Sequence, residues 1–278
     1  MPPQAHARVT VVRPAAGWAP LHLRELVESY ELLYFLVLRS LKVRYKQTLL
    51  GAAWAVLQPL LTMAIFSLVF GRLAKLDSEG VPYPVFALAG LVPWTYFANA
   101  LTQASNSLVE QERMLTKIYF PRLLLPLASV IAGLIDFAIA FFVLLCMMVF
   151  YHIPFTGRIL AVPGLMVAAA ATALAAGLWL AVLNVRYRDV RHALPFLTQV
   201  WLFATPIAYS STLVPAHLRP LVGLNPMAGI VDGFRWALLG REIGPGATLL
   251  VSLGVVSLLL VGGLYYFRRM ERTFADVV

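Results

Sequence analysis

The side chains best suited to proton transfer or metal binding are few and widely spaced in this sequence. Five histidines stand singly, and none lies in a long apolar run: His6, His22, His152, His192 and His217. Cys146 is the only cysteine, which excludes an intrachain disulfide. Acid-base catalysis and metal binding need several such groups that converge on one point. The pattern therefore predicts neither a catalytic centre nor a metal site.

Nucleotide hydrolysis requires a loop that cradles phosphate, and the sequence contains none of the G-x-x-x-x-G-K-[ST] type. None of the four lysines follows a glycine: Lys42, Lys46, Lys75 and Lys117. We therefore expect this chain to bind no cofactor and to have no ATPase activity of its own.

Asp136 is the one acidic residue that lies within a long apolar run. A carboxylate at membrane depth is costly, so two roles are open: a relay in an ion-coupled carrier, or a structural group that either has a partner on a neighbouring helix or is protonated and hydrogen-bonded. The second is favoured, because the other polar residues of the apolar runs do not ionise. They include Gln58, Asn99, Thr102, Gln103, Asn184 and Gln199. Such residues suit helix association or a polar conduit better than a proton wire.

Large aromatic side chains recur in and near the apolar runs. They include Trp54, Trp94, Tyr96, Phe97, Trp179, Trp201, Phe203 and Tyr209. Near the ends of membrane spans, such residues form a belt at the level of the lipid headgroups. Deeper ones can present flat faces to sugar rings, and both interpretations stay open.

Two short segments combine charge with helical periodicity. Residues 21–47 place Arg39, Lys42 and Lys46 on one helical face. This pattern predicts an amphipathic helix in the plane of the membrane interface. Its basic residues would bind lipid phosphates, and could also face an acidic partner surface.

The second such segment, residues 108–122, aligns Glu110, Arg113 and Lys117, with Met114 on another face. A helix this short is marginal in water, so a docking surface should stabilise it. The segment is either a hairpin beside the membrane or an element that transmits motion from a partner protein.

A third short helix is predicted between Asn225, a good N-cap residue, and Gly240, a good C-terminal residue. Pro226 suits its first turn, and Phe234 contributes to its apolar stripe. The segment should dip into the membrane surface and either line a passage or pack on the outer leaflet. Residues 215–222 could form a companion helix.

These residues must be positioned by apolar helices, because the chain has six stretches long enough to span a bilayer. Each offers roughly the 20 apolar residues that ~30 Å of hydrocarbon requires. The expected spans are residues 49–70, 85–107, 123–151, 159–185, 193–213 and 248–267. The sequence thus predicts an all-α integral membrane protein with an N-terminal interface helix and short external re-entrant helices.

Charge sets the expected orientation. Most of the 22 lysine and arginine residues fall on one side when the connections are assigned alternately. That side should be cytoplasmic, and both termini then lie in the cytosol. The net charge of +9 follows from this bias and does not imply nucleic acid.

Composition leaves little material for a separate soluble domain, since 60% of residues are hydrophobic and only 13% are charged. We expect one integral domain over residues 21–278. Residues 1–20 contain several prolines and no apolar core of a signal peptide, so we expect a loose cytosolic tail.

Several short motifs occur in a recognisable order: RSLKVRYK at residues 39–46, LG at 50–51, QP at 58–59, KIYFPR at 117–122, NVRYRD at 184–189, TPI at 205–207 and NPM at 225–227. Each is weak alone, but together they resemble the permease subunits of type 2 ABC exporters that move polysaccharides. The resemblance covers residues 32–267.

The resemblance implies a homodimeric permease of the inner membrane that pairs with two copies of a separate ATPase, which holds the ATP and Mg²⁺. It would export lipid-linked O-antigen or a similar polymer through a passage between the protomers. The candidate coupling residues are Glu110, Arg113, Met114, Lys117, Arg39, Lys42 and Lys46. The candidate channel residues are Trp54, Gln58, Tyr96, Asn99, Gln103 and Trp201. The candidate external gate residues are Pro215, Asn225, Pro226, Phe234 and Trp236.

Three other classes of protein stay open. An ABC exporter of a drug or a lipid would share the six spans and the missing ATPase. An ion-coupled secondary carrier would work through Asp136. An enzyme of lipid-linked sugar synthesis is the weakest alternative, because clustered acids and metal ligands are missing.

Overall fold

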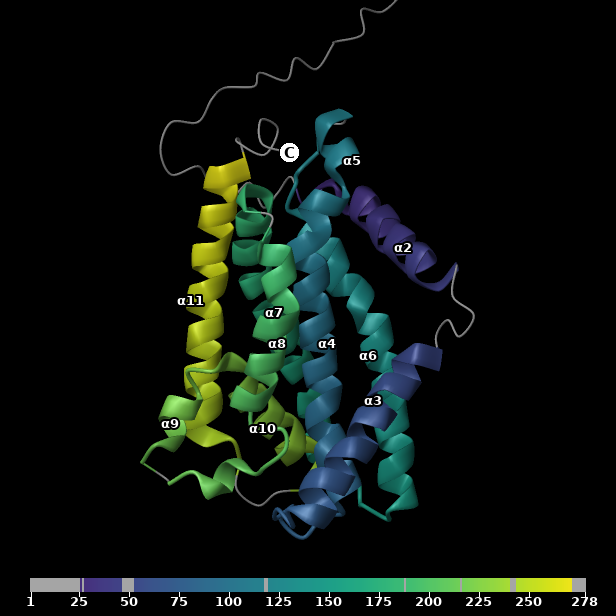
Figure 1. Cartoon of the computed structure of the whole chain (residues 1–278), viewed down its shortest axis with the longest axis vertical. Helices are drawn as coiled ribbons and strands as arrows, with labels where there is room; N and C mark the ends of the chain where they lie inside the picture. Colours follow the sequence, from purple (N-terminus) through teal and green to yellow (C-terminus); the bar gives the residue numbers. More distant parts are fainter. Residues whose placement is uncertain are drawn as a thin grey trace, which may run out of the picture.

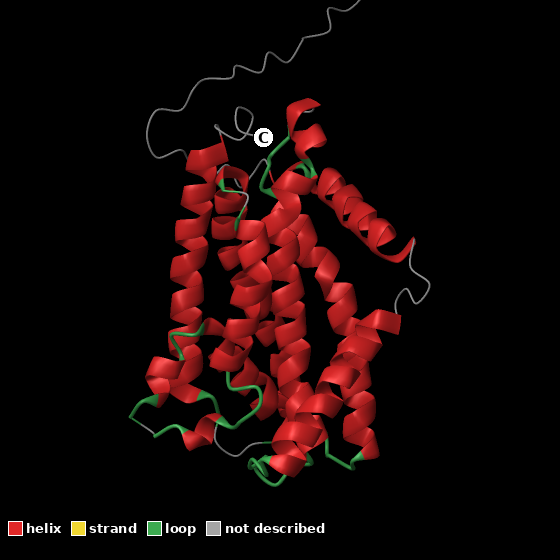
Figure 2. Cartoon of the chain, in the orientation of Figure 1, coloured by secondary structure: helices red, strands yellow, loops and turns green. Residues whose placement is uncertain are grey.

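The computed structural model of the chain describes residue 26 and residues 28–46, 53–117, 120–187, 189–215, 217–240 and 244–271. Within these ranges the secondary structure is helical, and no strand occurs (Figure 2). The expected tail at residues 1–20 and the first residues of the expected interface helix lie outside the described residues.

Five helical segments are long and apolar enough to cross a membrane. They are α3 with its π-helical continuation η1 (Ala53–Phe66 and Ser67–Leu73), α4 (Tyr83–Glu110), α6 (Leu124–Phe150), α7 (Val162–Arg186) preceded by η2 (Gly157–Ala161), and α11 (Gly246–Met270). They coincide with five of the six predicted spans. The all-helical membrane fold is therefore confirmed.

The predicted span 193–213 differs from the structure, because helix α8 comprises only Val190–Ala204. A helix of this length rises about 22 Å, which is short of a hydrocarbon core of about 30 Å. The next residue, Thr205, is extended (φ −95, ψ 136). Pro206 explains this ending, since a proline disfavours the helical conformation in the residue before it. The chain continues through η3 (Ser211–Leu213) and α9 (Arg219–Val222), so the count of six spans stays a prediction.

The short elements gather at the two ends of the bundle (Figure 1). Helix α2 (Tyr30–Lys46), helix α5 (Glu112–Lys117) and the C-terminal end of α11 lie at one end. The connection between η1 and α4, the loop after α6, and α9 lie at the other. Thus α2 and the end of α11 share one side of the molecule, as the topology predicted from charge requires.

Helix α4 forms the centre of the bundle and contacts α3, α6, α7, α8 and α10. Of its most apolar stretch 78% is buried, against 11% for α3, which lies at the periphery. Small residues bring α4 and α7 together: a Cβ atom on Gly177 would lie 2.8 Å from the Cβ of Ala104. The Asn184 amide joins the same helices by donating to the Ser105 carbonyl at 3.0 Å and to Asn106 Oδ1 at 2.9 Å. These contacts fix the position of α4 against α7.

Candidate translocation site

A cavity of about 290 Å³ lies between α2, α3, α4 and α6. It contains five of the six predicted channel residues: Trp54, Gln58, Tyr96, Asn99 and Gln103. The first two come from the start of α3 and the other three from α4. These five residues of one chain therefore line the same cavity.

Helical periodicity explains why α4 presents these side chains together. Tyr96, Asn99 and Gln103 follow one another at spacings of three and four residues, so they share one helical face. Asn99 and Gln103 are exposed to the cavity, whereas Tyr96 is buried at 3% exposure. The wall is therefore polar without being ionised along α4.

The Tyr96 side chain is fixed by its neighbours. Its hydroxyl donates to the carbonyl of Val130 at 3.1 Å, and its ring meets Phe137 edge-on with centroids 5.9 Å apart. A Cβ atom on Gly133 would lie 3.2 Å from the same ring. Tyr96 thus offers the cavity an aromatic surface, while its hydroxyl is already bonded to helix α6.

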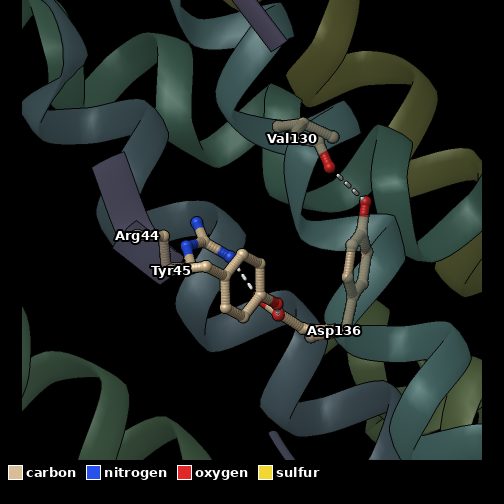
Figure 3. A network of polar contacts seen from close by, with 5 residues as sticks. Arg44, Tyr45, Val130 and Asp136 are labelled. Atoms are coloured by element: carbon tan, nitrogen blue, oxygen red, sulfur yellow. Dashed lines mark hydrogen bonds and ion pairs between the residues drawn. The ribbon is translucent and has the colours of Figure 1, made fainter. Parts of the chain in front are cut away.

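The charged residues of this cavity, Arg44 and Asp136, form one cluster with Tyr45 (Figure 3). Arg44 and Tyr45, from the last turn of α2, both donate to the carboxylate of Asp136 on α6. The side chains of Arg44 and Asp136 are 25% and 21% exposed, so the ion pair faces the cavity. Asp136 therefore has the structural partner that the sequence favoured over a relay.

Tyr45 takes part in this cluster as a hydrogen-bond donor. Burial, followed by the hydrogen bond to Asp136, raises the pKa of Tyr45 to about 12. Its hydroxyl is therefore protonated at neutral pH, and the proton is lost only well into the alkaline range.

A second cavity of about 380 Å³ adjoins the first between α2, α4 and α6. Arg44 and Gln103 line both cavities. The second one adds Arg39, Ser107 and Glu110, and so reaches the end of α4 that lies beside α5. Together the two cavities form a polar track along one face of α4.

The predicted coupling residues fall on three elements. Glu110 is the last residue of α4, and Gln111 leaves the helical conformation (φ −108, ψ 23), so α5 starts a new helix at Glu112. The single short helix expected over residues 108–122 is thus divided, and Glu110 does not continue the α5 face that carries Arg113. The described part of α5 runs from Glu112 to Lys117.

The interface helix and α5 nevertheless meet. Arg39 on α2 donates to the sulfur of Met114 on α5 at 3.8 Å. Lys42 and Lys46 are exposed on α2. The structure therefore brings Arg39, Met114 and Glu110 to one end of the bundle and leaves the two lysines on its surface.

Trp201 does not line the described cavities with the other channel candidates. Its ring packs edge-on against Phe97 with centroids 4.9 Å apart, and its indole N–H donates to Asn225 Oδ1 at 2.8 Å. Asn225 also caps α10 (Pro226–Leu239) by accepting from the Met227 amide at 3.1 Å, and it donates to Thr205 Oγ1 at 2.9 Å. Trp201 therefore joins α8 to the start of α10.

Helix α10 has the predicted boundaries, with Asn225 as N-cap, Pro226 in the first turn and Gly240 in a left-handed conformation (φ 70) at its end. It is not a surface helix. Phe234 is fully buried and meets Phe137 with centroids 6.0 Å apart, while α4, α7 and α11 surround the helix.

The other two gate candidates lie apart from the buried face of α10. Trp236 is half-buried under the guanidinium of Arg158, 5.4 Å from its ring centroid. Pro215 is exposed in the loop before α9. The five gate candidates therefore do not form one cluster.

Arg235 on α10 has a structural role that was not predicted from the sequence. It is fully buried, and it donates to the carbonyls of Pro206 and Ile207 at 2.6 Å each and of Tyr209 at 3.3 Å. Its guanidinium lies 3.7 Å from the ring centroid of Phe86. The three carbonyls belong to non-helical residues that follow α8, so no helical N–H group pairs with them. The Thr205-Pro206 break was the available signal, because it frees carbonyls that need a donor.

Arg44 and Tyr45 were also missed as site residues, although the motif that contains them was recognised. Asp136 was the available signal, since a lone intramembrane carboxylate needs a cation. Which basic residue pairs with Asp136 depends on the angle between α2 and α6, and helical periodicity does not specify that angle.

The comparisons with known proteins agree with this architecture. The model of the ABC-2 type transporter family matches residues 31–239. The chain is 31% identical to the O-antigen export system permease protein RfbA of Myxococcus xanthus, over 92% of this chain and 98% of that protein. It is 25% identical to the protein of the same name in Klebsiella pneumoniae, over 90% and 95%. It is 24% identical to the polysialic acid transport protein KpsM of Escherichia coli, over 85% and 92%. The chain therefore belongs to the ABC-2 type transporter family and is one of its membrane permeases.

Proposed function

We propose that this permease forms the membrane channel for a lipid-linked polysaccharide, O-antigen or a similar polymer, and exports it across the inner membrane. ATP hydrolysis in a separate subunit, which holds the ATP and Mg²⁺, supplies the energy. Two copies of the chain and two of the ATPase make up the transporter, with both termini in the cytosol.

The observation that carries this proposal is the composition of the cavity wall. Amide side chains from Gln58, Asn99 and Gln103 stand beside the aromatic rings of Trp54 and Tyr96. Sugar hydroxyls need many hydrogen-bond partners, and a polymer that must keep moving needs partners that are individually weak. Uncharged amides and aromatic faces meet both needs.

Relatives narrow the choice of cargo. Proteins named for O-antigen export and polysialic acid transport match the chain over most of its length. A relative named only as the inner membrane transport permease YadH of Escherichia coli is 25% identical over 73% of this chain. The relatives named for polymers cover more of the chain, which favours polysaccharide over a drug or a simple lipid.

ATP hydrolysis would be coupled to export at the end of the bundle where α2 and α5 lie. When the ATPase subunits close, they would push on α5, and the Arg39–Met114 contact would pass that movement to α2. Because Arg44 and Tyr45 join the last turn of α2 to α6, the movement would reach the cavity wall.

The test is export in cells that lack the native permease. Expression of the chain with its partner ABC ATPase should restore surface polymer, and a hydrolysis-deficient ATPase should abolish it. A drug or small lipid that stimulates ATP turnover where polymer does not would contradict the assignment.

The same cells separate the exporter from an ion-coupled carrier. Export should be unaffected when the proton gradient is collapsed while ATP is held constant. Export that continues with the hydrolysis-deficient ATPase would favour the carrier.

A further inference from the structure

The cluster of Arg44, Tyr45 and Asp136 resembles an anion-binding site. Arg44 and Tyr45 are the donors, and the carboxylate of Asp136 is the bound anion. Arg44 and Tyr45 donate to different oxygens of one carboxylate, Asp136 Oδ2 and Oδ1. A guanidinium and a neutral hydroxyl directed at two oxygens of one anion also suit two oxygens of a phosphate ester. We propose that this cluster binds the phosphate or diphosphate group of a lipid-borne substrate, with Asp136 holding the site when substrate is absent.

The position of Arg44 supports a role in binding a ligand. It lines both cavities of the polar track, together with Gln103. An anion that enters from the α5 end would therefore meet Arg44 before it reached the aromatic wall formed by Trp54 and Tyr96. Both partners of the ion pair stay partly exposed, so a ligand can reach them.

Electrostatics would allow Asp136 and a phosphate ligand to exchange at Arg44. An unpaired charge inside a membrane is costly, so Asp136 keeps Arg44 neutralised and the cavity closed to weak anions. A diphosphate carries more charge than a carboxylate and can displace it from the guanidinium. Tyr45 then remains as a donor to either anion, because a tyrosine hydroxyl is protonated at neutral pH.

Asp136 and the ligand would compete for one cation, and this predicts effects of opposite sign. Removing the charge of Asp136 should tighten anion binding, whereas removing Arg44 should weaken it. A purely structural ion pair predicts no tightening in either variant. The inference rests on the proposed function only for the identity of the cargo.

The experiment measures ligand binding to the full-length chain, co-purified with its ATPase in phosphatidylcholine nanodiscs. Farnesyl diphosphate is the probe, farnesol is its uncharged counterpart, and inorganic pyrophosphate tests the headgroup alone. Arg44→Ala should weaken the binding of farnesyl diphosphate about tenfold or more, the range of one lost charge-assisted hydrogen-bond pair. Asp136→Asn should tighten it about threefold or more, because the competing charge is gone.

Matched variants guard against misfolding. Arg44→Lys keeps the charge and should retain part of the affinity, while Arg72→Ala removes an exposed arginine near the end of η1 and should leave it unchanged. Equal binding of farnesol, unchanged binding in Arg44→Ala, or weaker or unchanged binding in Asp136→Asn would each overturn the site.

A further arm identifies the source of the phosphate. If phosphatidylglycerol added to the nanodiscs competes with farnesyl diphosphate at similar concentration, the cluster serves anionic membrane lipid, and the assignment to cargo is overturned. If it does not compete, the cluster serves the cargo. Because binding is measured without export, failure of this site and failure of the export assay are separate results.

Discussion

Among individual residues, Arg235 has a clear structural role, because it supplies hydrogen-bond donors to the irregular segment that follows α8. Its guanidinium satisfies three carbonyls that follow α8 and stacks on Phe86. A buried cation can serve there because several acceptors replace the water it has lost. We therefore expect its shape and its hydrogen-bonding geometry to matter as much as its charge.

Arg235→Met is predicted to lower the free energy of unfolding by about 3 kcal/mol or more, since buried carbonyls of Pro206 and Ile207 lose their donor. Arg235→Lys keeps the charge but cannot reach the carbonyls as a planar fork, so it should recover only part of the loss. The measurement is the melting temperature of the purified protein in one detergent. Equal melting temperatures for the parent and Arg235→Met would refute the role.

Asn225 is the second residue whose side chain joins separate elements. Asn225→Ala removes the cap of α10 and the contacts with Trp201 and Thr205. The loss should cost about 1 kcal/mol or more, which is typical of a lost helix cap. Asn225→Asp keeps the acceptor for the cap and for Trp201 and should be the milder change. Export and thermal stability of the two variants check this order.

At the level of elements, the contact between α4 and α7 permits a matched comparison within one helix. A Cβ atom on Gly177 would lie 2.8 Å from Ala104, whereas one on Gly164, also in α7, would meet nothing within 4 Å. Gly177→Ala should separate α4 from α7 and lower the melting temperature. Gly164→Ala should leave it equal or raise it slightly, because alanine favours helix by about 1 kcal/mol. The reverse order would mean that the two helices do not meet at this point.

Helix α5 is the element on which the coupling hypothesis depends. Replacing Glu110, Arg113 and Lys117 together by glutamine or alanine should uncouple ATP hydrolysis from export while the protein still inserts. The measurements are ATP turnover of the purified complex and surface polymer in cells. Normal export by this triple variant would remove α5 from the coupling pathway.

A pair of variants distinguishes the effect of the contact between α2 and α5 from the effect of charge alone. Arg39→Gln loses charge and weakens the contact with Met114, whereas Lys42→Gln loses the same charge from an exposed position. If the Arg39–Met114 contact transmits movement, Arg39→Gln should reduce export more than Lys42→Gln does.

For the whole molecule, the predicted topology can be tested with single cysteines because the natural chain has only Cys146. In a Cys146→Ser background, Lys75→Cys should react with a membrane-impermeant maleimide added to intact spheroplasts. Arg113→Cys should react only after the membrane is opened. Labelling of Arg113→Cys from outside would show that the true topology is the reverse of the predicted one. It would also contradict the coupling proposal.

The sequence predicted the fold well where one physical rule dominates. Five spans follow from length and hydropathy, and the boundaries of α10 follow from Asn225, Pro226 and Gly240. Five of the channel candidates also meet in one cavity, helped by the spacing that puts those on α4 on one helical face.

The remainder depended on tertiary geometry that periodicity does not specify. A hydropathy window could not find the end of α8 at Thr205, and it could not show that α10 lies inside the bundle. Trp201 resembled a channel residue by type but is held by Phe97 and Asn225. Arg44 reaches Asp136 only because α2 descends obliquely beside α6 (Figure 1).

The buried arginine of α10 also limits how the transporter can open. Arg235 donates hydrogen bonds to the backbone just beyond α8, and Asn225, the N-cap of α10, donates to Thr205 at the same point. We therefore expect α8 and α10 to move together. Any hinge for the outer end of the molecule then has to lie outside that pair of helices.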